Sequence, residues 1–262
     1  MSKVIGCDVG GTFTDLILLD EALGEVSIAK VPTTPNNQAV GVMAAMAQAG
    51  ADCAELSLLL HGTTTTTNAL LEKKIARCGL ITTAGFRDVL ELGRRTRPNP
   101  YGLIGSFEPL ISREYRLEVP ERMDADGKVV TALDEGAVRR AAAELVEMGC
   151  ESLVIHFLHA YANSSHEVRA AEIAAEVWPN SHITRGSAIL AEFREYERGV
   201  AAAVNAAIQP VLARYLERLR QELSGAGYAR DLLVMQGNGG TISSAMVAEQ
   251  AVNTVMSGPA SG

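Results

Sequence analysis

Three short apolar segments at the N-terminus constrain the fold of this chain more than any other feature of its sequence. Residues 4–9, 14–20 and 25–31 each have the composition of a β-strand, and glycines follow the first two segments. Because only four residues separate successive segments, each strand must turn back beside the one before it. The sequence therefore predicts an antiparallel meander of three strands.

Helices and strands alternate after the meander. Hydrophobic spacing and breaker residues predict a helix from Asn36 or Asn37 to Gly50, a strand at 56–60, a helix at 68–74, a strand at 78–82 and a helix at about 85–95. The predicted order is β-β-β-α-β-α-β-α, which differs from the steady strand-helix repeat of a dinucleotide-binding domain. We expect an α/β fold that begins with a meander and continues with parallel crossovers.

The rest of the chain is predicted to hold an inserted segment and a long helix. Asp126-Gly127 is a hairpin signal between strands at 115–119 and 128–131. A helical stretch runs from about 189 to 223 unless Pro210 divides it. We expect three segments: the first part of a phosphate-binding lobe at 1–95, an inserted α+β segment at 96–186, and the long helix with the start of a second lobe at 187–262.

Composition excludes several kinds of partner. The chain has 23 basic and 31 acidic residues, a formal net charge of −8, whereas nucleic acids and anionic membranes attract basic surfaces. No apolar run reaches the ~18–20 residues of a membrane span. The N-terminus lacks the apolar core of a signal peptide, and the four cysteines include no CxxC pair. We expect a cytoplasmic protein without a zinc site or a disulfide framework.

The segment DVGGTFTD at residues 8–15 carries the clearest chemical signal. Two glycines after a strand let backbone N–H groups approach an anion, and Thr12 and Thr14 add hydroxyl donors. The Asp8 carboxylate beside them suits Mg²⁺ or its water shell. The pattern is neither a P-loop nor a dinucleotide-binding fingerprint. A plain Gly-Gly hairpin turn is the alternative, but the flanking threonines and aspartates favour a phosphate.

Hydroxyl groups are concentrated in a second segment, HGTTTTTN at residues 61–68. It follows a predicted buried strand, and the C-terminal ends of strands are where open α/β sheets bind ligands. The alternative is that Thr66 or Thr67 caps the following helix while the other hydroxyls are solvated, since Ser and Thr are common helix caps. The residue pattern is as compatible with capping as with a binding site.

The charged and histidine-rich segments favour structural roles. Arg87–Arg97 can hold an anionic substrate, but it is more typical of a solvated helix in which Asp88 or Glu91 pairs with Arg94 or Arg95. The charged residues at 192–198 are interpreted as pairs within a helix. His156, His159 and His166 lack the neighbouring cysteines or carboxylates expected at a metal site.

The motifs along the whole chain resemble those of a known family. DVGGTFTD is similar to the first phosphate motif of the superfamily of acetate kinase, sugar kinases, heat-shock chaperones and actin. HGTTTTTNALLE, TTAGFRDVLELGR, YANSSHE, EYERG, NAAIQP and SGPASG resemble, in this order, segments of the hydantoinase A and 5-oxoprolinase family. That family also includes subunits of acetone and acetophenone carboxylases and of caprolactamase. The resemblance implies a ribonuclease-H-like lobe at residues 1–95.

The resemblance further implies ATP-dependent opening of a cyclic amide, such as a hydantoin or 5-oxoproline. ATP with Mg²⁺ would phosphorylate the carbonyl oxygen, and water would attack the activated product. Gly10, Gly11, Thr12 and Thr14 would hold the phosphates, Asp8 would orient the Mg²⁺ water shell, and Asp15 would brace the loop. Further candidates, which would line the cleft, are His61, Thr63, Thr64, Asn68 and Arg94.

The resemblance also implies that other parts complete the enzyme. A hydantoinase B-type subunit or domain would supply the hydrolytic half, and the full-length protein is expected to be an oligomer. This sequence ends before a second phosphate motif, so we expect an incomplete second lobe and an inactive isolated chain. The alternatives are an ATP-using carboxylase subunit, to which the same residues apply, and a non-catalytic fragment.

Overall fold

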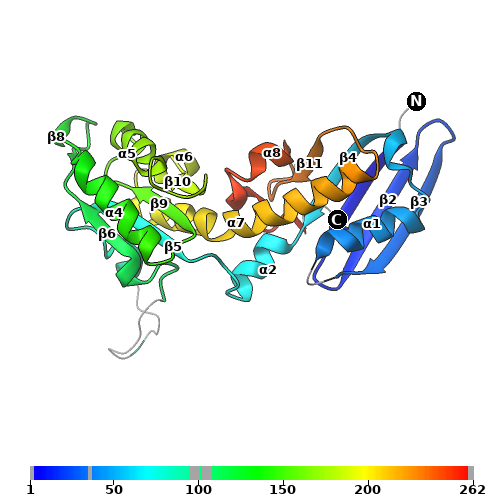
Figure 1. Cartoon of the computed structure of the whole chain (residues 1–262), viewed down its shortest axis with the longest axis horizontal. Helices are drawn as coiled ribbons and strands as arrows, with labels where there is room; N and C mark the ends of the chain where they lie inside the picture. Colours follow the sequence, from blue (N-terminus) through cyan, green and yellow to red (C-terminus); the bar gives the residue numbers. More distant parts are fainter. Residues whose placement is uncertain (1–2, 35–36, 95–100, 102–107, 259–262) are drawn as a thin grey trace. The chain divides into compact units, whose positions relative to one another are not determined.

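The structure is a computed structural model that describes residues 3–34, 37–94, 101 and 108–258 (Figure 1). Some residues singled out above lie outside the described residues, namely Asn36, Arg95, Arg97 and the last four residues of SGPASG. Among the described residues, no helix combines the length and the apolar character that crossing a membrane requires.

The chain divides into two compact units. The first unit combines Met1–Ile75 with Val211–Gly262, and the second unit is Ala76–Pro210. These bounds differ from the three segments expected from the sequence, because the strand at 78–83 pairs with strands of the second unit. The chain returns to the first sheet only with the strand Leu232–Met235. The second unit is therefore an insertion into the first.

A six-stranded mixed sheet forms the centre of the first unit (Figure 1). Its strands, in spatial order, are β12 (Thr241–Ser243), β11 (Leu232–Met235), β4 (Leu56–Thr63), β1 (Lys3–Val9), β2 (Phe13–Asp20) and β3 (Glu25–Pro32). Strands β1, β2 and β3 are successively antiparallel, which confirms the predicted meander. Strand β4 is parallel to β1 and to β11.

Helices cover one face of this sheet. Helix α1 (Gln38–Gln48) packs on β1, β2 and β3. The part of helix α7 (Glu195–Gly225) that belongs to the first unit buries Leu212, Leu216 and Leu219, spaced three to four residues apart as one helical face. Shorter helical elements complete the unit: η1 (Cys53–Glu55), α2 (Thr65–Leu71), α8 (Ser244–Val247) and η3 (Ala251–Thr254).

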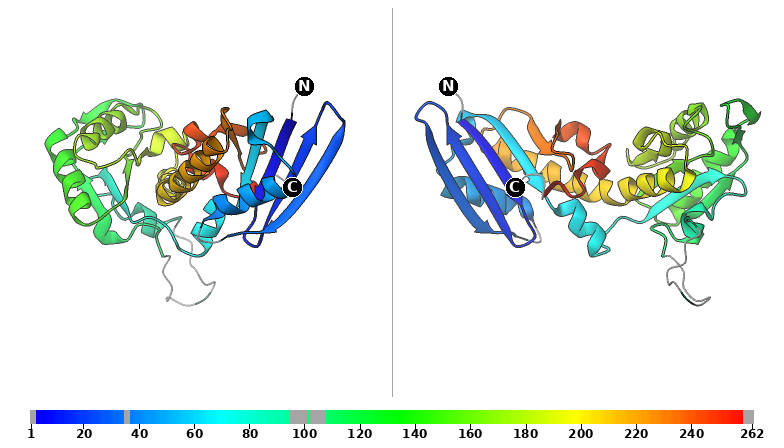
Figure 2. Two further views of the ribbon diagram at one scale, coloured as in Figure 1. Left: turned by 45° about the vertical axis from the view of Figure 1, so that its right-hand side comes forward. Right: turned by 180° about the vertical axis from the view of Figure 1, so that it is seen from behind.

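The face of the meander opposite α1 is uncovered in the described chain, as the rear view in Figure 2 shows. Cross-strand pairs on this face join Ile17 to Ile28 and Leu19 to Val26. These side chains are 52%, 72%, 37% and 58% exposed, respectively. Alternation along each strand explains the arrangement, because Leu16, Leu18 and Ala29 point to the helix-covered face and are buried.

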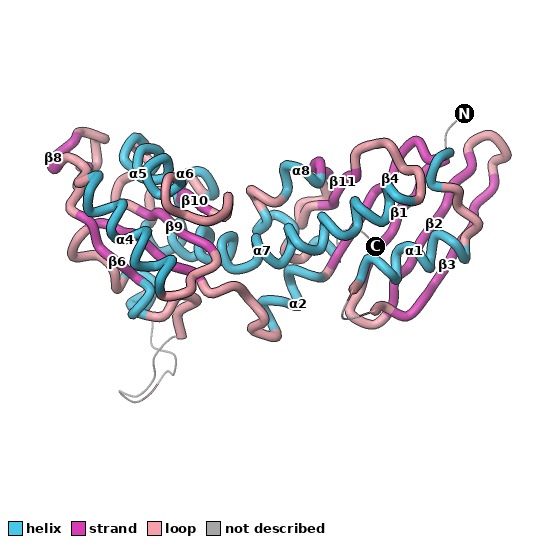
Figure 3. The backbone as a smooth tube through the Cα atoms, in the orientation of Figure 1, coloured by secondary structure: helices cyan, strands magenta, loops and turns pink. Residues whose placement is uncertain are grey.

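A four-stranded parallel sheet forms the centre of the second unit (Figure 3). Its order is β10 (Ile183–Arg185), β9 (Ser152–His156), β5 (Cys78–Thr83) and β6 (Arg116–Val119). The central strands β5 and β9 are buried along their whole length, as expected where helices cover both faces of a parallel sheet. Its helical elements are the part of α7 that ends at Pro210, together with α3 (Val89–Leu92), η2 (Arg113–Tyr115), α4 (Glu135–Glu147), α5 (Ser165–Ala175) and α6 (Gly186–Ile189).

Several predictions about the second unit need correction. The hairpin around Asp126-Gly127 joins β8 (Val129–Thr131) to β7 (Arg122–Met123), because β6 pairs with β5 instead. The helix predicted at 85–95 is four residues long, Val89–Leu92. Pro210 lies within α7 and does not divide it. The predicted start of that helix at 189 lies instead at Glu195, after the separate helix α6.

The N-terminal cap of α4 gives a test of the second unit. The Asp134 carboxylate accepts a hydrogen bond from the Ala137 amide at 2.8 Å. Removing such a cap costs about 1 kcal/mol, so Asp134→Ala should lower the unfolding free energy of this unit by that amount. The fluorescence of Trp178, the chain's single tryptophan, reports the change, because Trp178 is buried in the same core as α4. The variant Asp126→Ala, at an exposed turn position, should leave the unfolding free energy unchanged within experimental error. Equal losses of unfolding free energy in both variants would contradict the capping role of Asp134.

Candidate functional site

The loop between β1 and β2 presents two backbone N–H groups outward. Gly10 closes the turn, because its N–H donates to the Phe13 carbonyl at 2.9 Å. Gly11 and Thr12 are exposed, and in the described part of the chain their N–H groups make no hydrogen bond. The loop thus has the free donors that an anion requires.

Thr33, which follows β3, holds this loop in place. Its hydroxyl donates to the Gly10 carbonyl at 2.9 Å, and its N–H donates to the Thr12 carbonyl at 2.9 Å. Both carbonyls are therefore turned toward the protein. The Gly11 N–H shares its peptide plane with the Gly10 carbonyl and points the opposite way, so this arrangement turns the Gly11 N–H outward.

Thr14 lies beneath the loop and not on its surface. It is fully buried, and its hydroxyl is 3.1 Å from that of Thr33. The alternation of β2 places Thr14 on the helix-covered face with Leu16. The sequence predicted that Thr14 would contact phosphate, but its position makes it a packing partner of the residue that holds the loop.

The two aspartates of the motif lie on the opposite face from Thr14. Asp8 and Asp15 are directly opposed on neighbouring strands. Asp15 pairs with Lys30 of β3 at 2.8 Å, and both side chains are about half exposed. Asp15 therefore joins β2 to β3. Asp8 is half-buried, one residue before the end of β1, and lies close to the outward-facing loop.

The threonine-rich segment joins the end of β4 to α2, and its hydroxyls link several elements. The Thr64 hydroxyl donates to the Val9 carbonyl at 3.1 Å and accepts from the Asn68 amide at 3.2 Å. Thr63 and Thr65 hydroxyls are 2.7 Å apart, and the latter also bonds to Gln38. Capping, one of the two sequence interpretations, is not seen: Thr66 and Thr67 lie within α2, and the N-cap residue Thr64 makes no side-chain capping hydrogen bond. The Thr65 N–H donates to the hydroxyl of Thr63, one residue before the cap position.

The chain after α8 packs on the same threonines, a contact that sequence reasoning missed. The Thr254 hydroxyl donates to that of Thr66 at 3.0 Å, the Met256 N–H donates to the Thr67 hydroxyl at 3.0 Å, and the Ser257 hydroxyl donates to a carbonyl of β4. These contacts join residues almost two hundred positions apart. No local pattern signals them.

His61 lies in the interior, although the sequence suggested that it lines the cleft. It is fully buried, and its Nε2 is 2.7 Å from the Tyr215 hydroxyl of α7. Burial lowers the pKa of His61 to about 4, so the ring is neutral at pH 7. Its role is to attach α7 to β4. The remaining cleft candidate, Arg94, lies in the second unit and pairs with Glu197 at 2.6 Å.

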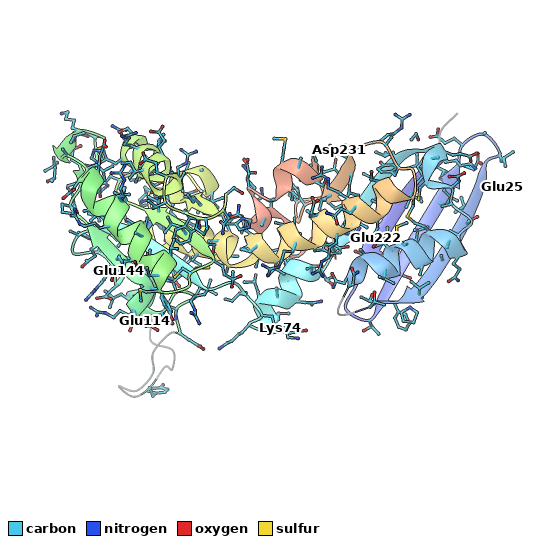
Figure 4. The ribbon with its side chains drawn as sticks, in the orientation of Figure 1. Glu25, Lys74, Glu114, Glu144, Glu222 and Asp231 are labelled. Carbon is cyan, nitrogen blue, oxygen red and sulfur yellow. The ribbon has the colours of Figure 1, made fainter. Side chains whose placement is uncertain are left out.

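A cavity of about 320 Å³ adjoins the Gly10–Thr12 loop within the first unit. Gly11 and Asn68 belong both to its wall and to the sequence-predicted site. The other lining residues come from α1, α2, α7 and the turns beside them: Thr33, Asn37, Gln38, Thr65, Ala69, Glu72, Lys74, Val211, Arg214, Tyr215 and Arg218. Figure 4 labels Lys74, just beyond α2. The α7 residues were missed, since only the fold brings them to this loop.

Buried polar residues of the second unit form structural contacts. His166 Nδ1 lies 2.8 Å from the buried Glu121 carboxylate, which also bonds to Thr83. The buried Arg198 guanidinium donates to the Glu192 and Phe157 carbonyls. Within the described ranges, no group of three His, Cys, Asp or Glu side chains has the arrangement of a metal site.

The charged segment at 87–97 also forms structural pairs, but with distant residues. Arg116 is buried and lies 2.9 Å from Glu91, while Asp88 pairs with Arg113 at 2.9 Å. Of the two predicted partners of these carboxylates, Arg94 pairs with Glu197 instead, and Arg95 lies outside the described residues. Arg194, the residue just before α7, lies 3.6 Å from Glu197 in the first turn of that helix, so this predicted pair forms across the helix start.

Comparison with protein-family models decides the relationship. Residues 4–178 match the hydantoinase/oxoprolinase N-terminal region, and residues 198–262 match the hydantoinase/oxoprolinase model. The chain belongs to the hydantoinase/oxoprolinase family. This confirms the resemblance found in the sequence motifs.

Individual relatives agree with this assignment. The caprolactamase subunit alpha of Pseudomonas jessenii is 32% identical over 98% of this chain, and an uncharacterized protein of Methanocaldococcus jannaschii is 38% identical over 100% of it. The crystal structure of ATP-dependent caprolactamase from P. jessenii superposes with a TM-score of 0.87 at 31% identity over 98% of this chain and 39% of that one. The nucleotide-free acetone carboxylase structure superposes with a TM-score of 0.85 at 28% identity, over 98% of this chain and 39% of that one. This chain spans 38–39% of the two sequence relatives.

The buried His61 predicts a pH dependence of the first unit. In the unfolded chain His61 binds a proton below about pH 6.5, but in the folded unit it does so only near pH 4. Unfolding is therefore favoured as the pH falls from 6.5 toward 4, by at most about 1.4 kcal/mol per pH unit. Hydrogen exchange of the β4 amides at pH 7 and pH 5, corrected for intrinsic rates, measures this loss.

The variant His61→Gln provides the control, because its amide can still bond to Tyr215 but does not titrate. The pH dependence should become shallower in His61→Gln, even if that variant is less stable at every pH. An unchanged slope would exclude His61 as its source.

Proposed function

We propose that this chain is the ATP-binding portion of an ATP-dependent cyclic-amide hydrolase. The outward-facing N–H groups of Gly11 and Thr12, with Asp8 at the end of the neighbouring strand, carry the proposal. Relatives named caprolactamase subunit alpha, at 32% identity, and 5-oxoprolinase 1 of Arabidopsis thaliana, at 30%, support the choice of a cyclic amide. Both names denote enzymes that act on a ring amide.

The first unit is proposed to be a ribonuclease-H-like lobe. Its strand order β3-β2-β1-β4-β11, with the first three strands antiparallel and the next two parallel to β1, supports this assignment. In this interpretation β11 supplies the fifth strand of the lobe. The second unit is then an insertion between α2 and the part of α7 that begins at Val211. A second lobe that closes over the nucleotide would lie in the rest of a longer protein.

The chemistry proposed for this chain is phosphate positioning. Gly11 and Thr12 would donate to phosphate oxygens, while Gly10 and Thr33 hold the loop in its shape. Mg²⁺ typically binds through one or two carboxylates together with phosphates and water, and Asp8 fits this requirement as a half-buried carboxylate beside the loop. When bound, Mg²⁺ would neutralise phosphate charge. Phosphoryl transfer depends mostly on such positioning and charge stabilisation.

The full reaction needs further parts. Transfer of the terminal phosphoryl group to the ring carbonyl oxygen would make the ring carbon susceptible to attack by water. A hydantoinase B-type partner is proposed to supply the water-activating residues. The relatives named as alpha, beta and gamma subunits of larger enzymes support an assembly with partner chains.

An ATP-using carboxylase subunit is the second candidate. The acetophenone carboxylase gamma subunit of Aromatoleum aromaticum is 32% identical over 98% of this chain, and this observation favours it. A longer protein containing this sequence, assayed with its partner, separates the candidates. ATP hydrolysis that requires a cyclic amide supports the hydrolase, and ATP hydrolysis that requires both a ketone and bicarbonate supports the carboxylase.

The loop itself is tested with the present chain. Titration with Mg-triphosphate and Mg-ATP should shift the amide NMR signals of Gly11 and Thr12 at millimolar concentrations, since one lobe supplies only part of the contacts. Thr12→Val should weaken this binding about five- to tenfold, because it removes one hydroxyl donor to a charged group. Thr131→Val, at an exposed position in β8, should have no effect. Signal shifts confined to other residues would refute the proposed phosphate site.

A further inference from the structure

One helix belongs to both compact units. Helix α7 is continuous, and the boundary between the units falls within it, between Pro210 and Val211. The other connection crosses between Ile75 and Ala76, within residues 74–77, which have no regular secondary structure. The chain therefore passes between the units at two places, and any change in the relative orientation of the units must be absorbed there.

The helical hydrogen bonds are irregular at this boundary. Pro210 has no N–H, so it cannot give the Ala206 carbonyl the bond that this group accepts in a regular helix. The next carbonyl, that of Ala207, would accept from the Val211 N–H in such a helix, and in this structure it accepts from the Ala76 N–H at 2.9 Å. Helices kink at proline and where another group enters the ladder of backbone bonds. Helix α7 is thus weakest where it passes from one unit to the other.

Buried side chains attach α7 to a different sheet on each side of Pro210. Before the proline, the Asn205 side-chain amide donates to the Thr184 hydroxyl of β10 at 3.0 Å. After it, the Tyr215 hydroxyl lies 2.7 Å from Nε2 of His61 in β4. All four of these side chains are buried. Because each half of the helix is fixed to its own unit, bending is concentrated in the turn between them.

The second connection lies against the same turn of α7. The hydrogen bond from Ala76 ends on the Ala207 carbonyl, three residues before Pro210. Connections that are far apart allow rotation only about the line that joins them. Connections that lie together allow rotation about several axes, because neither has to be stretched. Domain hinges are typically a few such residues, which absorb changes in φ and ψ while each domain keeps its internal structure.

We infer that residues 207–211 of α7, together with residues 74–77, form a hinge on which the second unit rotates relative to the first. The bonds of Asn205 and Tyr215 hold each half of the helix on its own sheet while the hinge bends. The hinge is independent of the proposed phosphate site, because no residue of the Gly10–Thr12 loop takes part in it. Hinge motions of domains occur in microseconds to milliseconds, and NMR measures their average.

Residual dipolar couplings from the 262-residue chain, carrying a lanthanide tag, test the hinge. The four native cysteines are buried, so Glu144→Cys, at an exposed position of α4, provides the attachment point in the second unit (Figure 4). The degree of order fitted to the couplings of the second unit is the reference, since the tag is fixed to that unit. Rotation about the hinge should average the couplings of the first unit to a lower degree of order.

The variant Pro210→Ala tests the part that the proline plays. It should remove most of the difference in order between the units, because the added N–H can bond to the Ala206 carbonyl and complete the helix. Gln221→Ala is the matched control, since Gln221 is exposed on the same helix but lies within the first unit. This control should leave the difference unchanged.

The outcomes separate the hinge from the proposed function. Equal degrees of order in the two units, with Pro210 and Gln221 both retained, would overturn the hinge whether or not either variant folds. A difference that persists in folded Pro210→Ala would exclude bending at the proline as its source. Mg-triphosphate can still shift the Gly11 and Thr12 signals of a rigid chain, so failure of the hinge leaves the phosphate site standing.

Discussion

Parallel pairing of β4 on both of its edges is the constraint on which the candidate site depends. Strand β4 lies between β1 and β11 and runs parallel to both, so three strands end at the same edge of the sheet. The Gly-Gly loop follows β1, and the threonine segment follows β4. Their proximity therefore results from strand direction, and the Thr64 hydrogen bond to the Val9 carbonyl shows how close these two strand ends lie.

Local patterns were sufficient to predict the elements near the N-terminus. Alternation and turn residues located the meander, and the bounds of β1, β2 and β3 lie within one residue of those predicted. The same alternation contains the information that Thr14 faces inward, because its neighbours Leu16 and Leu18 are apolar. The Thr14 hydroxyl was interpreted as a phosphate ligand because it lies in a motif typical of phosphate binding. Its position on the strand, however, places it inside the protein.

Long-range pairing accounts for what the sequence did not reveal. Strand β5 has the composition of any buried strand, so its membership of the second sheet depends on partners such as β9, some seventy residues later. His61 and Tyr215 are 154 positions apart, and no local spacing relates them. The same holds for Arg214 and Arg218, whose position beside Gly11 depends on where α7 returns to the first sheet.

The hydrogen bond between the Ala76 N–H and the Ala207 carbonyl, 2.9 Å long, brings the two ends of the second unit together. A segment whose ends meet can be inserted into a host fold, or removed from it, with little change to the chain on either side. The first unit could thus have existed before the insertion was acquired, with a short loop in its place. Replacing residues 77–206 with a brief glycine-rich linker would then be a route to a minimal version of this lobe.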